Sequence, residues 1–357
     1  MRQLEIFKNK KVLITGHTGF KGSWLSLWLK NLNSNVLGVS LNIPTTPSHY
    51  NALGLRNEIR NEFVNIRDLT KLKKIFRKFK PDFVFHLAAQ SLVKKSYSNP
   101  ELTFNTNSIG TLNVLECLRE TKKNCIAVII TSDKVYKNKE IKRGYKENDI
   151  LGGVDPYSAS KASAELIIDS YFNSFLKYKK NLRIGIARAG NVIGGGDWSE
   201  NRLIPDCIKS WSINSTVKIR NPNSTRPWQH VLDAVYGYLL LAIKLKKNRK
   251  LNGQAFNFGP SAQNNFKVID ILKLMKKFWK SIKWNINIKK NNHYESSLLK
   301  LNSNKSKKYL NWKANLNFVE SVKYTIEWYK FFYQNKKKIN KLSSYQISQY
   351  TRKIKKD

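Results

Sequence analysis

The sequence predicts an α/β fold with a doubly wound parallel sheet and a smaller C-terminal lobe. Short, almost continuously apolar runs alternate with amphipathic stretches over the first half of the chain. Such runs are typical of strands that are buried on both faces of a parallel sheet by the helices between them. The candidate strands are KKVLITG, NVLGVSL, PDFVFHLA, CIAVIITS and LRIGIAR, and the clearest candidate helices are FKGSWLSLWLKNL and DLTKLKKIFRKFK.

A glycine-rich turn joins the first candidate strand to the first candidate helix. Gly16, Gly19 and Gly22 stand three residues apart in this turn. Glycines at such positions permit a tight turn and a close approach of the backbone to a pyrophosphate, whose charge the helix N-terminus stabilises. Glycines alone are common in turns, but their place between strand and helix indicates a Rossmann-type dinucleotide site.

The end of the second candidate strand bears on the choice of dinucleotide. The segment VLGVSLNIP holds neither an acidic residue for a ribose 2′-hydroxyl nor an arginine for a 2′-phosphate. Ser40 can donate a hydrogen bond to the ribose. This pattern favours NAD while leaving NADP open, and it is compatible with weak cofactor binding.

The composition changes after residue 188. A glycine-rich loop, AGNVIGGGDW, is followed by proline-interrupted segments and scattered tryptophans, and RPWQHVLDAVYGYLLLAI then returns a helix to the sheet. We expect an NAD-binding domain over residues 1–190, with a returning segment at about 228–258. A mainly substrate-binding lobe is expected over residues 191–335. Residues 336–357 form a basic tail with little apolar periodicity, which we expect to pack loosely.

Length and composition indicate a globular protein in a reducing compartment. The 357 residues include 41% apolar and 12% aromatic side chains, enough for a sizeable core. The three cysteines lack the spacing of a metal site or a disulfide framework, so we expect neither. No apolar signal segment and no run of about 18 apolar residues occurs, which favours a cytoplasmic protein without membrane contact.

The formal net charge of +41 has several explanations. Lysine and arginine are spread along the chain and accompanied by abundant asparagine and isoleucine. Because all three of lysine, asparagine and isoleucine have A/T-rich codons, a biased genome explains the charge without a partner. An anionic substrate or surface is a second explanation, and nucleic-acid binding is a third that the absence of a basic stripe disfavours.

A tyrosine and a lysine open a predicted helix in the segment DPYSASKASAELII. Tyr157 and Lys161 are four residues apart and therefore share one helix face, and Pro156 suits the first turn. A nearby ammonium group lowers the pKa of a phenol, which can then remove a hydroxyl proton as hydride leaves the same carbon. An ordinary surface pair is the alternative that the two residues alone would favour.

A hydroxyl, an acid and an amine follow the strand CIAVIITS in succession. Ser132, Asp133 and Lys134 stand where the strand ends. Their simplest interpretation is a solvated acid–base pair after a strand. In a parallel sheet, however, this edge also carries the glycine turn, so the three side chains are candidates for catalysis.

Together these features resemble the extended short-chain dehydrogenase/reductases. Over residues 8–330 the chain resembles their nucleotide-sugar 4,6-dehydratase branch, and the combination of GHTGFKGSWL, LAAQSLV, TSDKVY, GGGDW and RPWQHV is most similar to the members acting on CDP-glucose. The resemblance implies an NAD-dependent hydro-lyase that oxidises C4, eliminates water across C5 and C6, and returns hydride to C6. The product would be CDP-4-dehydro-6-deoxyglucose, made for deoxysugar and lipopolysaccharide O-antigen synthesis.

The resemblance also implies roles for the catalytic candidates. Ser132, Tyr157 and Lys161 would form the hydride-transfer set. Asp133 would protonate the departing C6 hydroxyl, and Lys134 takes the position of the base that removes the C5 proton. A lysine base must be neutral, so water or the tyrosine could share that step.

The resemblance extends to two sets of binding residues. Asp68 would contact the adenine, and the remaining members of the first set would line the cofactor. The expected cofactor-binding residues are Gly16, Thr18, Gly19, Phe20, Gly22, Ser40, Asp68, Leu87, Ala88, Ala89, Gln90, Asn107, Tyr157 and Lys161. The expected substrate-binding residues are Gln90, Asn191, Arg202, Arg226, Trp228 and His230.

Physical chemistry ranks the substrate candidates. A diphosphate favours a guanidinium group, for which Arg226 is the first candidate and Arg202 the second. Trp228 and Trp198 can stack on the base or sugar, although tryptophan is as often a core residue. His230 is expected to bind or to support the structure, and His17 in the glycine turn is likewise expected to orient neighbours.

Other functions remain open at this point. A dehydratase for a GDP-, dTDP- or UDP-linked hexose is the nearest alternative, followed by an epimerase, which would not need Asp133 and Lys134. A nucleotide-sensing or nucleic-acid-binding protein would account for the charge but not for the tyrosine–lysine set. The resemblance further implies a homodimer or homotetramer.

Overall fold

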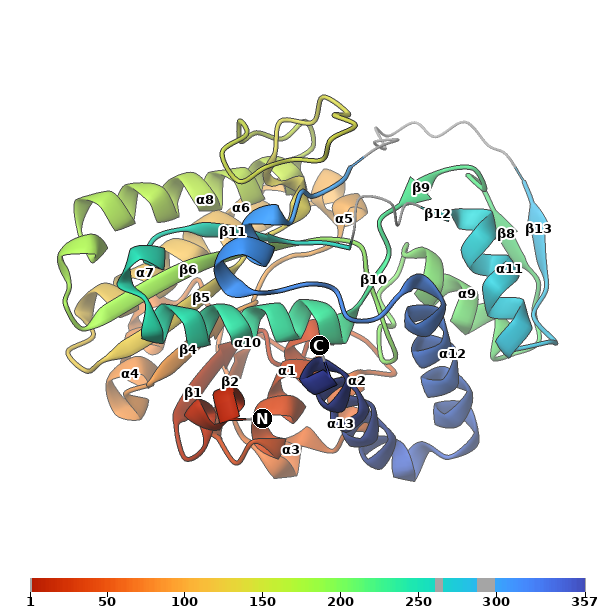
Figure 1. Ribbon diagram of the computed structural model, residues 1–357, viewed down its shortest axis with the longest axis horizontal. Coiled ribbons are helices and arrows are strands. Elements are labelled where there is room, and N and C mark those ends of the chain that lie inside the picture. Colours follow the sequence, from red (N-terminus) through yellow and green to blue (C-terminus); the bar gives the residue numbers. More distant parts are fainter. Residues whose placement is uncertain (1, 261–265, 288–298, 357) are drawn as a thin grey trace.

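The computed structural model describes residues 2–260, 266–287 and 299–356, and it confirms the predicted α/β fold (Figure 1). The central sheet is parallel throughout, with the strand order β11-β6-β5-β4-β1-β2-β3. Its strands are β1 (Lys11–Thr15), β2 (Asn35–Ser40), β3 (Arg60–Phe63), β4 (Phe83–His86), β5 (Cys125–Ile130), β6 (Leu182–Ala189) and β11 (Ala255–Phe258). The order reverses between β1 and β4, which in doubly wound sheets creates a ligand crevice at the carboxyl ends.

Helices cover both faces of the sheet. One layer holds α4 (Leu69–Phe79), α7 (Gly110–Glu120) and α8 (Pro156–Ser174), and the other holds α1 (Phe20–Asn31) and α10 (Val231–Lys247). Successive strand residues point to opposite layers, as period-two alternation requires. In β4, Val84 packs in the α4–α7–α8 layer, whereas Phe83 and Phe85 pack in the α1–α10 layer.

Helix α1 is buried around its whole circumference. All residues from Gly22 to Leu29 are buried, which is the pattern of a core helix rather than a surface helix. The sheet covers one side of α1, and α10 and the last helix, α13 (Ile339–Lys356), cover the other. Trp28 of α1 shows this arrangement, because its ring lies 5.7 Å from that of Tyr350 of α13.

The second lobe, on the right of Figure 1, carries the predicted irregular segments. Its elements are α9 (Leu203–Trp211), β8 (Val217–Ile219), β9 (Thr225–Arg226), β12 (Phe266–Lys267), α11 (Val268–Phe278), β13 (Trp284–Ile286) and α12 (Phe318–Gln334). Strands β7 (Val192–Ile193) and β10 (Gln229–His230) pair where the chain passes between the lobes. The chain then returns to the sheet through α10 and β11, within the expected range 228–258.

The C-terminal segment differs from the expected loose tail. Residues Ile339–Lys356 form α13, and Ile339 and Tyr350 are fully buried. Apolar residues recur along one face of this helix among many lysines, so the basic composition conceals the amphipathic period. The remaining short elements are η1 (Arg2–Phe7), α2 (His49–Ala52), α3 (Leu55–Glu58), α5 (Val93–Ser98), α6 (Pro100–Phe104), η2 (Asn105–Ile109), η3 (Asp133–Val135), η4 (Leu176–Tyr178), η5 (Arg249–Leu251), η6 (Ser306–Leu310) and η7 (Lys336–Lys338).

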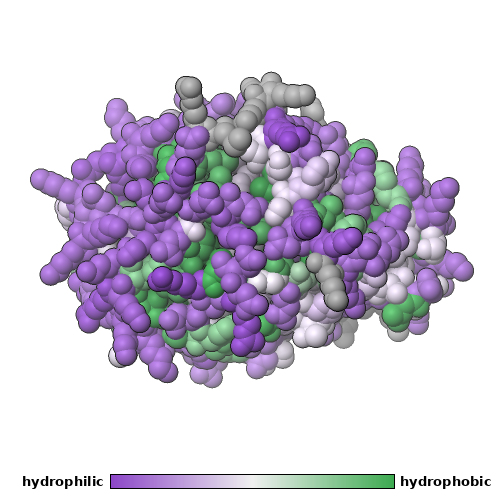
Figure 2. Space-filling model, turned by 90° about the horizontal axis from the view of Figure 1, so that it is seen from below, coloured by the Kyte–Doolittle hydropathy of each residue, from purple (hydrophilic) through white to green (hydrophobic). Residues whose placement is uncertain are grey.

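Hydrophilic side chains dominate the face drawn in Figure 2, with small apolar areas between them. This is consistent with a charge that is spread over the chain rather than gathered in one stripe. Within the described ranges, no helix is long and apolar enough to cross a membrane.

Candidate active site

The predicted site residues lie at the carboxyl edge of the sheet. Gly16 follows β1, Leu87 follows β4, Ser132 follows β5 and Gly190 follows β6. These four strands are adjacent in the sheet, so segments far apart in the sequence meet at one edge. The crevice is therefore where a doubly wound sheet normally binds its ligand.

Close packing explains two of the three glycines in the turn after β1. Gly16 has a φ of +77°, and a Cβ atom there would lie 2.6 Å from the backbone nitrogen of Ala88. A Cβ atom at Gly22 would lie 2.1 Å from the carbonyl oxygen of Gly16. Only glycine fits at both positions, since real Cβ contacts under 3.0 Å essentially do not occur. The turn is thereby pressed against the Leu87–Ala89 segment that follows β4.

The start of α1 is prepared for an anion. Gly19 is the N-cap residue, and no side chain caps this helix. Its first-turn N–H groups are therefore available to a pyrophosphate, as the glycine pattern predicts. Thr18, directly before the cap, donates its hydroxyl to the carbonyl oxygen of Asn42 at 2.7 Å and so ties the turn to the end of β2.

Ser40 lies at the predicted place but within a polar network. Its Oγ contacts His17 Nδ1 at 2.9 Å and accepts from the Thr18 amide at 3.3 Å. The other ring nitrogen of His17 contacts Asn61 Oδ1 at 2.9 Å. Burial lowers the pKa of His17 to about 4, so its ring is neutral near pH 7. These contacts agree with the expected orienting role of His17.

Asn107 connects the turn after β4 to the catalytic helix. Its Oδ1 accepts from the Gln90 amide at 2.8 Å, and its Nδ2 donates to the Gln90 carbonyl at 3.0 Å and to Ser160 Oγ at 2.9 Å. The side chain of Gln90 donates through Nε2 to Thr103 Oγ1 of α6 at 3.0 Å and accepts through Oε1 from the Leu92 amide at 2.7 Å. The cofactor and substrate contacts expected of the Gln90 side chain would therefore compete with these bonds.

Asp68 has a structural partner. Its carboxylate caps α4 by accepting from the Lys71 amide at 3.0 Å, and it pairs with the Lys71 ammonium at 3.2 Å. The backbone hydrogen bond from Lys71 lowers the pKa of this carboxyl group. Its expected contact with adenine remains a prediction.

The catalytic helix α8 begins as predicted. Asp155 caps it by accepting from the Ser158 amide at 3.0 Å, and Pro156 occupies its first turn. Tyr157 and Lys161 are 8% and 7% exposed, which excludes the alternative of an ordinary surface pair. The Tyr157 hydroxyl is hydrogen bonded to Ser132. Ser132 and Tyr157 of the predicted set therefore meet at the end of β5, and Lys161 lies one turn further along the same helix.

Burial governs the pKa values of this set. Desolvation raises the pKa of Tyr157, and the bond with Ser132 and the charge of Arg202 oppose that rise. Desolvation lowers the pKa of Lys161 to about 8, which Glu165 opposes. Lys161 therefore titrates near physiological pH.

Asp133 is buried and held from several sides. It is 4% exposed, so it is not part of a solvated pair that ends the strand. Its Oδ1 accepts from Ser132 Oγ at 3.0 Å, and its Oδ2 accepts from Asn191 Nδ2 at 3.4 Å. The Lys134 amide in turn donates to Ser132 Oγ at 3.2 Å. Asn191, expected to bind substrate, thus contacts the candidate acid.

Arg202 lies at the reacting end of the site. Its Nη1 donates to Asp197 Oδ2 at 3.0 Å, and its charge acts on Tyr157. The structure thus couples it electrostatically to the catalytic tyrosine, a relationship the sequence analysis does not predict. Its proposed contact with the diphosphate remains a prediction.

Lys21, in the first turn of α1, is a further charged residue near the predicted site that the sequence does not single out. Burial lowers its pKa to about 8, with Arg202 and Lys161 acting in the same direction and Asp133 opposing. Its ammonium group therefore belongs to the same electrostatic cluster as the catalytic groups. A lysine in the first turn of a helix is unfavourable because of the helix dipole, and this signal could have found it.

The other substrate candidates lie in the second lobe and at its junction with the sheet. Arg226 is in the β9–β12 ribbon and donates through Nη1 to the Thr225 carbonyl at 2.8 Å. Trp228 is 8% exposed. His230 caps α10 by accepting from the Leu232 amide at 3.3 Å, and burial lowers its pKa to about 3. This favours the structural role among the two expected for His230.

Trp198 is a core residue. It is 1% exposed and packs in an aromatic cluster, with ring centroids 5.6 Å from Trp328 and 4.8 Å from Phe332. Of the two roles expected for Trp198, stacking on the substrate and packing in the core, the structure favours packing in the core.

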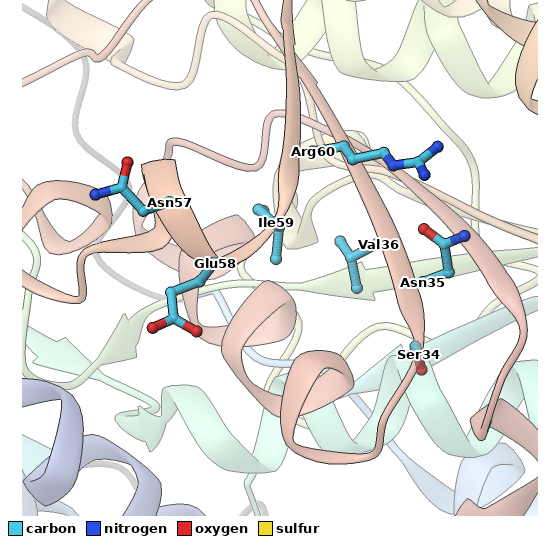
Figure 3. Close-up of a pocket in the computed structure, with 7 residues that line it drawn as sticks. All are labelled: Ser34, Asn35, Val36, Asn57, Glu58, Ile59 and Arg60. Atoms are coloured by element: carbon cyan, nitrogen blue, oxygen red, sulfur yellow. The ribbon is translucent and has the colours of Figure 1, made fainter.

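A depression lies at the opposite, amino edge of the sheet. It is formed at the amino ends of β2 and β3, and Figure 3 shows its lining side chains. They are Ser34, Asn35, Val36, Asn57, Glu58, Ile59 and Arg60. None of the predicted catalytic residues reaches it, so the carboxyl edge is the candidate site. Among the described residues, no cluster of His, Cys, Asp or Glu is arranged to hold a metal ion.

Comparison with known proteins identifies the family. The family model for GDP-mannose 4,6 dehydratase matches residues 13–325. A CDP-glucose 4,6-dehydratase of Salmonella typhimurium is 41% identical over 91% of this chain and 91% of its own length. A dTDP-D-glucose 4,6-dehydratase of Dictyostelium discoideum is 31% identical over 70% of this chain and 58% of its own length. A UDP-glucose 4-epimerase of Mycoplasma genitalium is 26% identical over 91% and 98%, respectively.

Solved structures show the same fold. The epimerase Mth375 of Methanothermobacter thermautotrophicus superposes with a TM-score of 0.80 and 24% identity, over 96% of this chain and 97% of that one. A UDP-glucose 4-epimerase of Thermotoga maritima gives a TM-score of 0.78 and 23% identity, over 90% and 98%. Given the family match over most of its length, the chain belongs to the GDP-mannose 4,6 dehydratase family of nucleotide-sugar enzymes.

Proposed function

We propose that this protein is an NAD-dependent nucleotide-sugar 4,6-dehydratase that converts CDP-glucose to CDP-4-dehydro-6-deoxyglucose and water. The observation that carries the proposal is the buried carboxyl group of Asp133 beside Ser132, Tyr157 and Lys161. Hydride transfer alone needs only the last three residues, whereas loss of water also needs a proton donor. The CDP-glucose 4,6-dehydratase relative at 41% identity supports the choice of sugar nucleotide.

The residues present fit a dinucleotide. The uncapped first turn of α1 suits the pyrophosphate, and Ser40 and the backbone after β4 suit the adenosine and nicotinamide halves. When bound, NAD takes up hydride from C4 of the sugar and gives it back at C6. A solved dTDP-glucose 4,6-dehydratase of Bacillus anthracis with the same fold is described in complex with NAD, which supports this cofactor.

The chain's own residues move the protons. Tyr157 removes the C4 hydroxyl proton, assisted by its hydrogen bond with Ser132 Oγ, which acts as acceptor because the Ser132 hydroxyl donates to Asp133, and by the positive charges of Lys161 and Arg202. The resulting ketone acidifies the C5 proton, which a base at the position of Lys134 removes and then returns to C5 when hydride is delivered to C6. Asp133 then protonates the departing C6 hydroxyl as water.

Substrate binding is proposed for the second lobe. Arg226 is the candidate for the diphosphate, and Trp228 lies two residues further along the same segment. Arg202 is close enough to Tyr157 to act on its charge, so we assign it to the sugar end rather than to the base. Asn191 is proposed to orient Asp133 as well as the substrate.

One experiment tests the proposed reaction and its substrate. The protein is incubated with NAD and, separately, CDP-, dTDP-, GDP- and UDP-hexoses, while NMR follows loss of the C6 hydroxymethyl signal and appearance of a methyl signal. A methyl signal from CDP-glucose is the expected result. A methyl signal from another donor alone would change the substrate, and none from any donor would refute the dehydratase.

We further propose a homodimer formed through α6, η2, α7 and α8. These elements are neighbours and expose three large apolar side chains, Phe104, Ile109 and Leu166, at 37%, 43% and 60%. Exposed apolar side chains on adjacent helices are typical of a protein–protein interface. Two such dimers could pair into the homotetramer that is the alternative.

We also place the protein in the cytoplasm, in deoxysugar synthesis for a surface polysaccharide such as lipopolysaccharide O-antigen. Its three cysteines are free and buried thiols, as expected in a reducing compartment. If the protein acts in deoxysugar synthesis, the unreacted sugar nucleotide should accumulate in cells that lack it.

A further inference from the structure

A buried ion pair lies beneath the catalytic groups and takes no part in the proposed chemistry. Glu165 is on α8, one turn after Lys161, and Arg188 is on β6. Both side chains are 4% exposed. The Nε of Arg188 donates to Glu165 Oε1 at 2.8 Å and to Oε2 at 3.0 Å, and its Nη2 also donates to Oε2. A buried pair is expensive to desolvate, so its place in the fold calls for a reason beyond stability.

The remaining bonds of this pair reach both ends of the turn that carries the candidate acid. Glu165 Oε1 accepts from Thr131 Oγ1 at 2.6 Å, directly before Ser132. Arg188 Nη1 donates to the Tyr136 hydroxyl at 2.7 Å, and the guanidinium lies 4.9 Å from the Tyr136 ring centroid. One ion pair thus holds residues 131 and 136, which flank the turn.

The same ion pair is also part of the helix and the strand that carry other site residues, α8 and β6. Glu165 belongs to the helix that carries Tyr157 and Lys161, so its bond to Thr131 fixes the distance between that helix and the end of β5. Arg188 stands two residues before Gly190, against which Asp133 packs. Movement of the pair would therefore shift the acid relative to the tyrosine.

We propose that Glu165 and Arg188 are positioning residues that hold the Ser132–Lys134 turn against Tyr157 and Lys161, so that loss of water follows hydride transfer without delay. The proposal rests on the proposed function for its kinetic part only. In the proposed reaction, neither Glu165 nor Arg188 touches a reacting atom.

The pair also acts on the charge of Lys161. Glu165 is the group that opposes the desolvation of this lysine, and the other titratable groups coupled to it are Lys21 at the start of α1 and His86 at the end of β4. Loss of the Glu165 charge therefore lowers the pKa of Lys161, and the ammonium is then lost at a lower pH.

Two variants break the links one at a time and leave the ion pair in place. Thr131→Val removes the hydroxyl bonded to Glu165. Tyr136→Phe removes the hydroxyl that accepts from Arg188 and donates to Asn257. Thr325→Val and Tyr236→Phe are matched controls, because each removes a hydrogen-bonded hydroxyl from a buried residue of α12 or α10. We expect kcat for the methyl product to fall about tenfold in the first two, with KM within about twofold. Reduced cofactor, followed at 340 nm, should accumulate in them and not in the controls.

Hydrogen exchange supplies a readout that needs no substrate. We expect faster exchange in a peptide covering residues 129–138 in Thr131→Val and Tyr136→Phe than in the parent and both controls. Unchanged exchange with unchanged kcat would overturn the proposal. If the parent forms no methyl product but exchange differs as expected, the dehydratase function fails while the positioning role stands.

The charge variant Glu165→Gln keeps the shape of the side chain. We expect the alkaline limb of the hydride-transfer step to move to lower pH by at least about half a unit. An unmoved limb in folded protein would contradict the electrostatic part. Because Glu165→Gln leaves Arg188 without its charged partner and can fail to fold, the Thr131 and Tyr136 variants remain decisive.

Discussion

Asp133 packs directly against Gly190, and a Cβ atom at position 190 would lie 1.9 Å from the Asp133 Oδ2 atom. The two residues come from neighbouring strands, since Asp133 follows β5 and Gly190 follows β6. The position of the acid in the site therefore depends on the absence of a side chain on the adjacent strand.

Replacement of that glycine should displace the acid. Gly190→Ala is expected to lower the rate of water loss at least tenfold, on the order of 1.4 kcal/mol, because the methyl group pushes the carboxylate away from the C6 hydroxyl. Single-turnover NMR of the methyl product measures the change. Gly152→Ala is the control, since its Cβ would meet nothing nearer than 3.4 Å. Equal rates in the two variants would argue against this packing constraint.

Removal of the acid itself should separate the two chemical steps. Asp133→Asn is expected to transfer hydride at near the parental rate but to eliminate water about 100-fold more slowly, since general acids contribute that much or more. Absorbance at 340 nm should therefore rise and persist while the methyl signal appears slowly. Elimination at the parental rate would remove Asp133 from the mechanism.

The rate of hydride transfer should depend on the charge of Lys161. The lysine is expected to act as an ammonium, and burial lowers its pKa from 10.5 to about 8. On the alkaline side the rate should therefore fall as the pH rises through about 8, where the ammonium group is lost. A single-turnover pH profile measures this, with Lys161→Met as the variant that should lose the alkaline limb along with most of the rate. A profile flat to pH 10 in the parent would contradict the assignment.

Stability should depend on Asp233, a fully buried residue of α10. Its Oδ1 accepts from Tyr350 and from the Asn315 amide at 2.7 Å each, whereas its Oδ2 has no partner among the described residues. Burial raises its pKa from 3.8 to about 7, with Lys353 opposing. The folded state therefore binds more protons than the unfolded state in this window, and stability falls as the pH rises through it.

Asp233→Asn removes the titration while keeping the acceptor. As the pH rises from acidic to mildly alkaline, the free energy of unfolding of the variant should increase relative to that of the parent by on the order of 2–4 kcal/mol. Thermal melting at pH 5 and pH 8 measures this difference, with the exposed-site variant Asp169→Asn for comparison. A parent and variant with parallel pH dependences would contradict the prediction.

The proposed dimer can be tested on its exposed apolar surface. Leu166→Glu places a charge on α8 among the side chains expected at the interface, so the mass in solution should fall to that of one chain. Light scattering after size exclusion measures the mass. Ile213→Glu, on a still more exposed apolar residue of the second lobe, should leave the mass unchanged. A monomeric parent would refute the dimer.

The sequence predicts those parts of the site that depend on local order along the chain. The glycine turn, Tyr157 and Lys161 each sit at a strand end or a helix start, so their position follows from the predicted elements. Arg202 and Trp198 differ because their neighbours, Asp197 and Trp328, are set by loop and tertiary geometry. Sequence patterns give the elements of a fold but not which side chains of a loop turn toward one another.

The C-terminal helix, α13, shows the same limit of sequence patterns, because here they predict a loose tail where a packed helix forms. Its lysines suggest a solvated tail, yet Tyr350 is buried against Trp28 of α1. Only the packing of α1, which needs a cover on its outer side, explains why the helix forms there.

The packing of α13 on α1 has a genetic consequence. The helix whose first turn is expected to receive the cofactor is supported from behind by α13, through Tyr350 and through Ser344, whose Oγ accepts from Asn31 Nδ2 at 3.1 Å. A late premature stop codon would thus behave as a defect in cofactor retention although it spares every catalytic group. A purification tag at the carboxyl end is tolerable only where it leaves this helix docked.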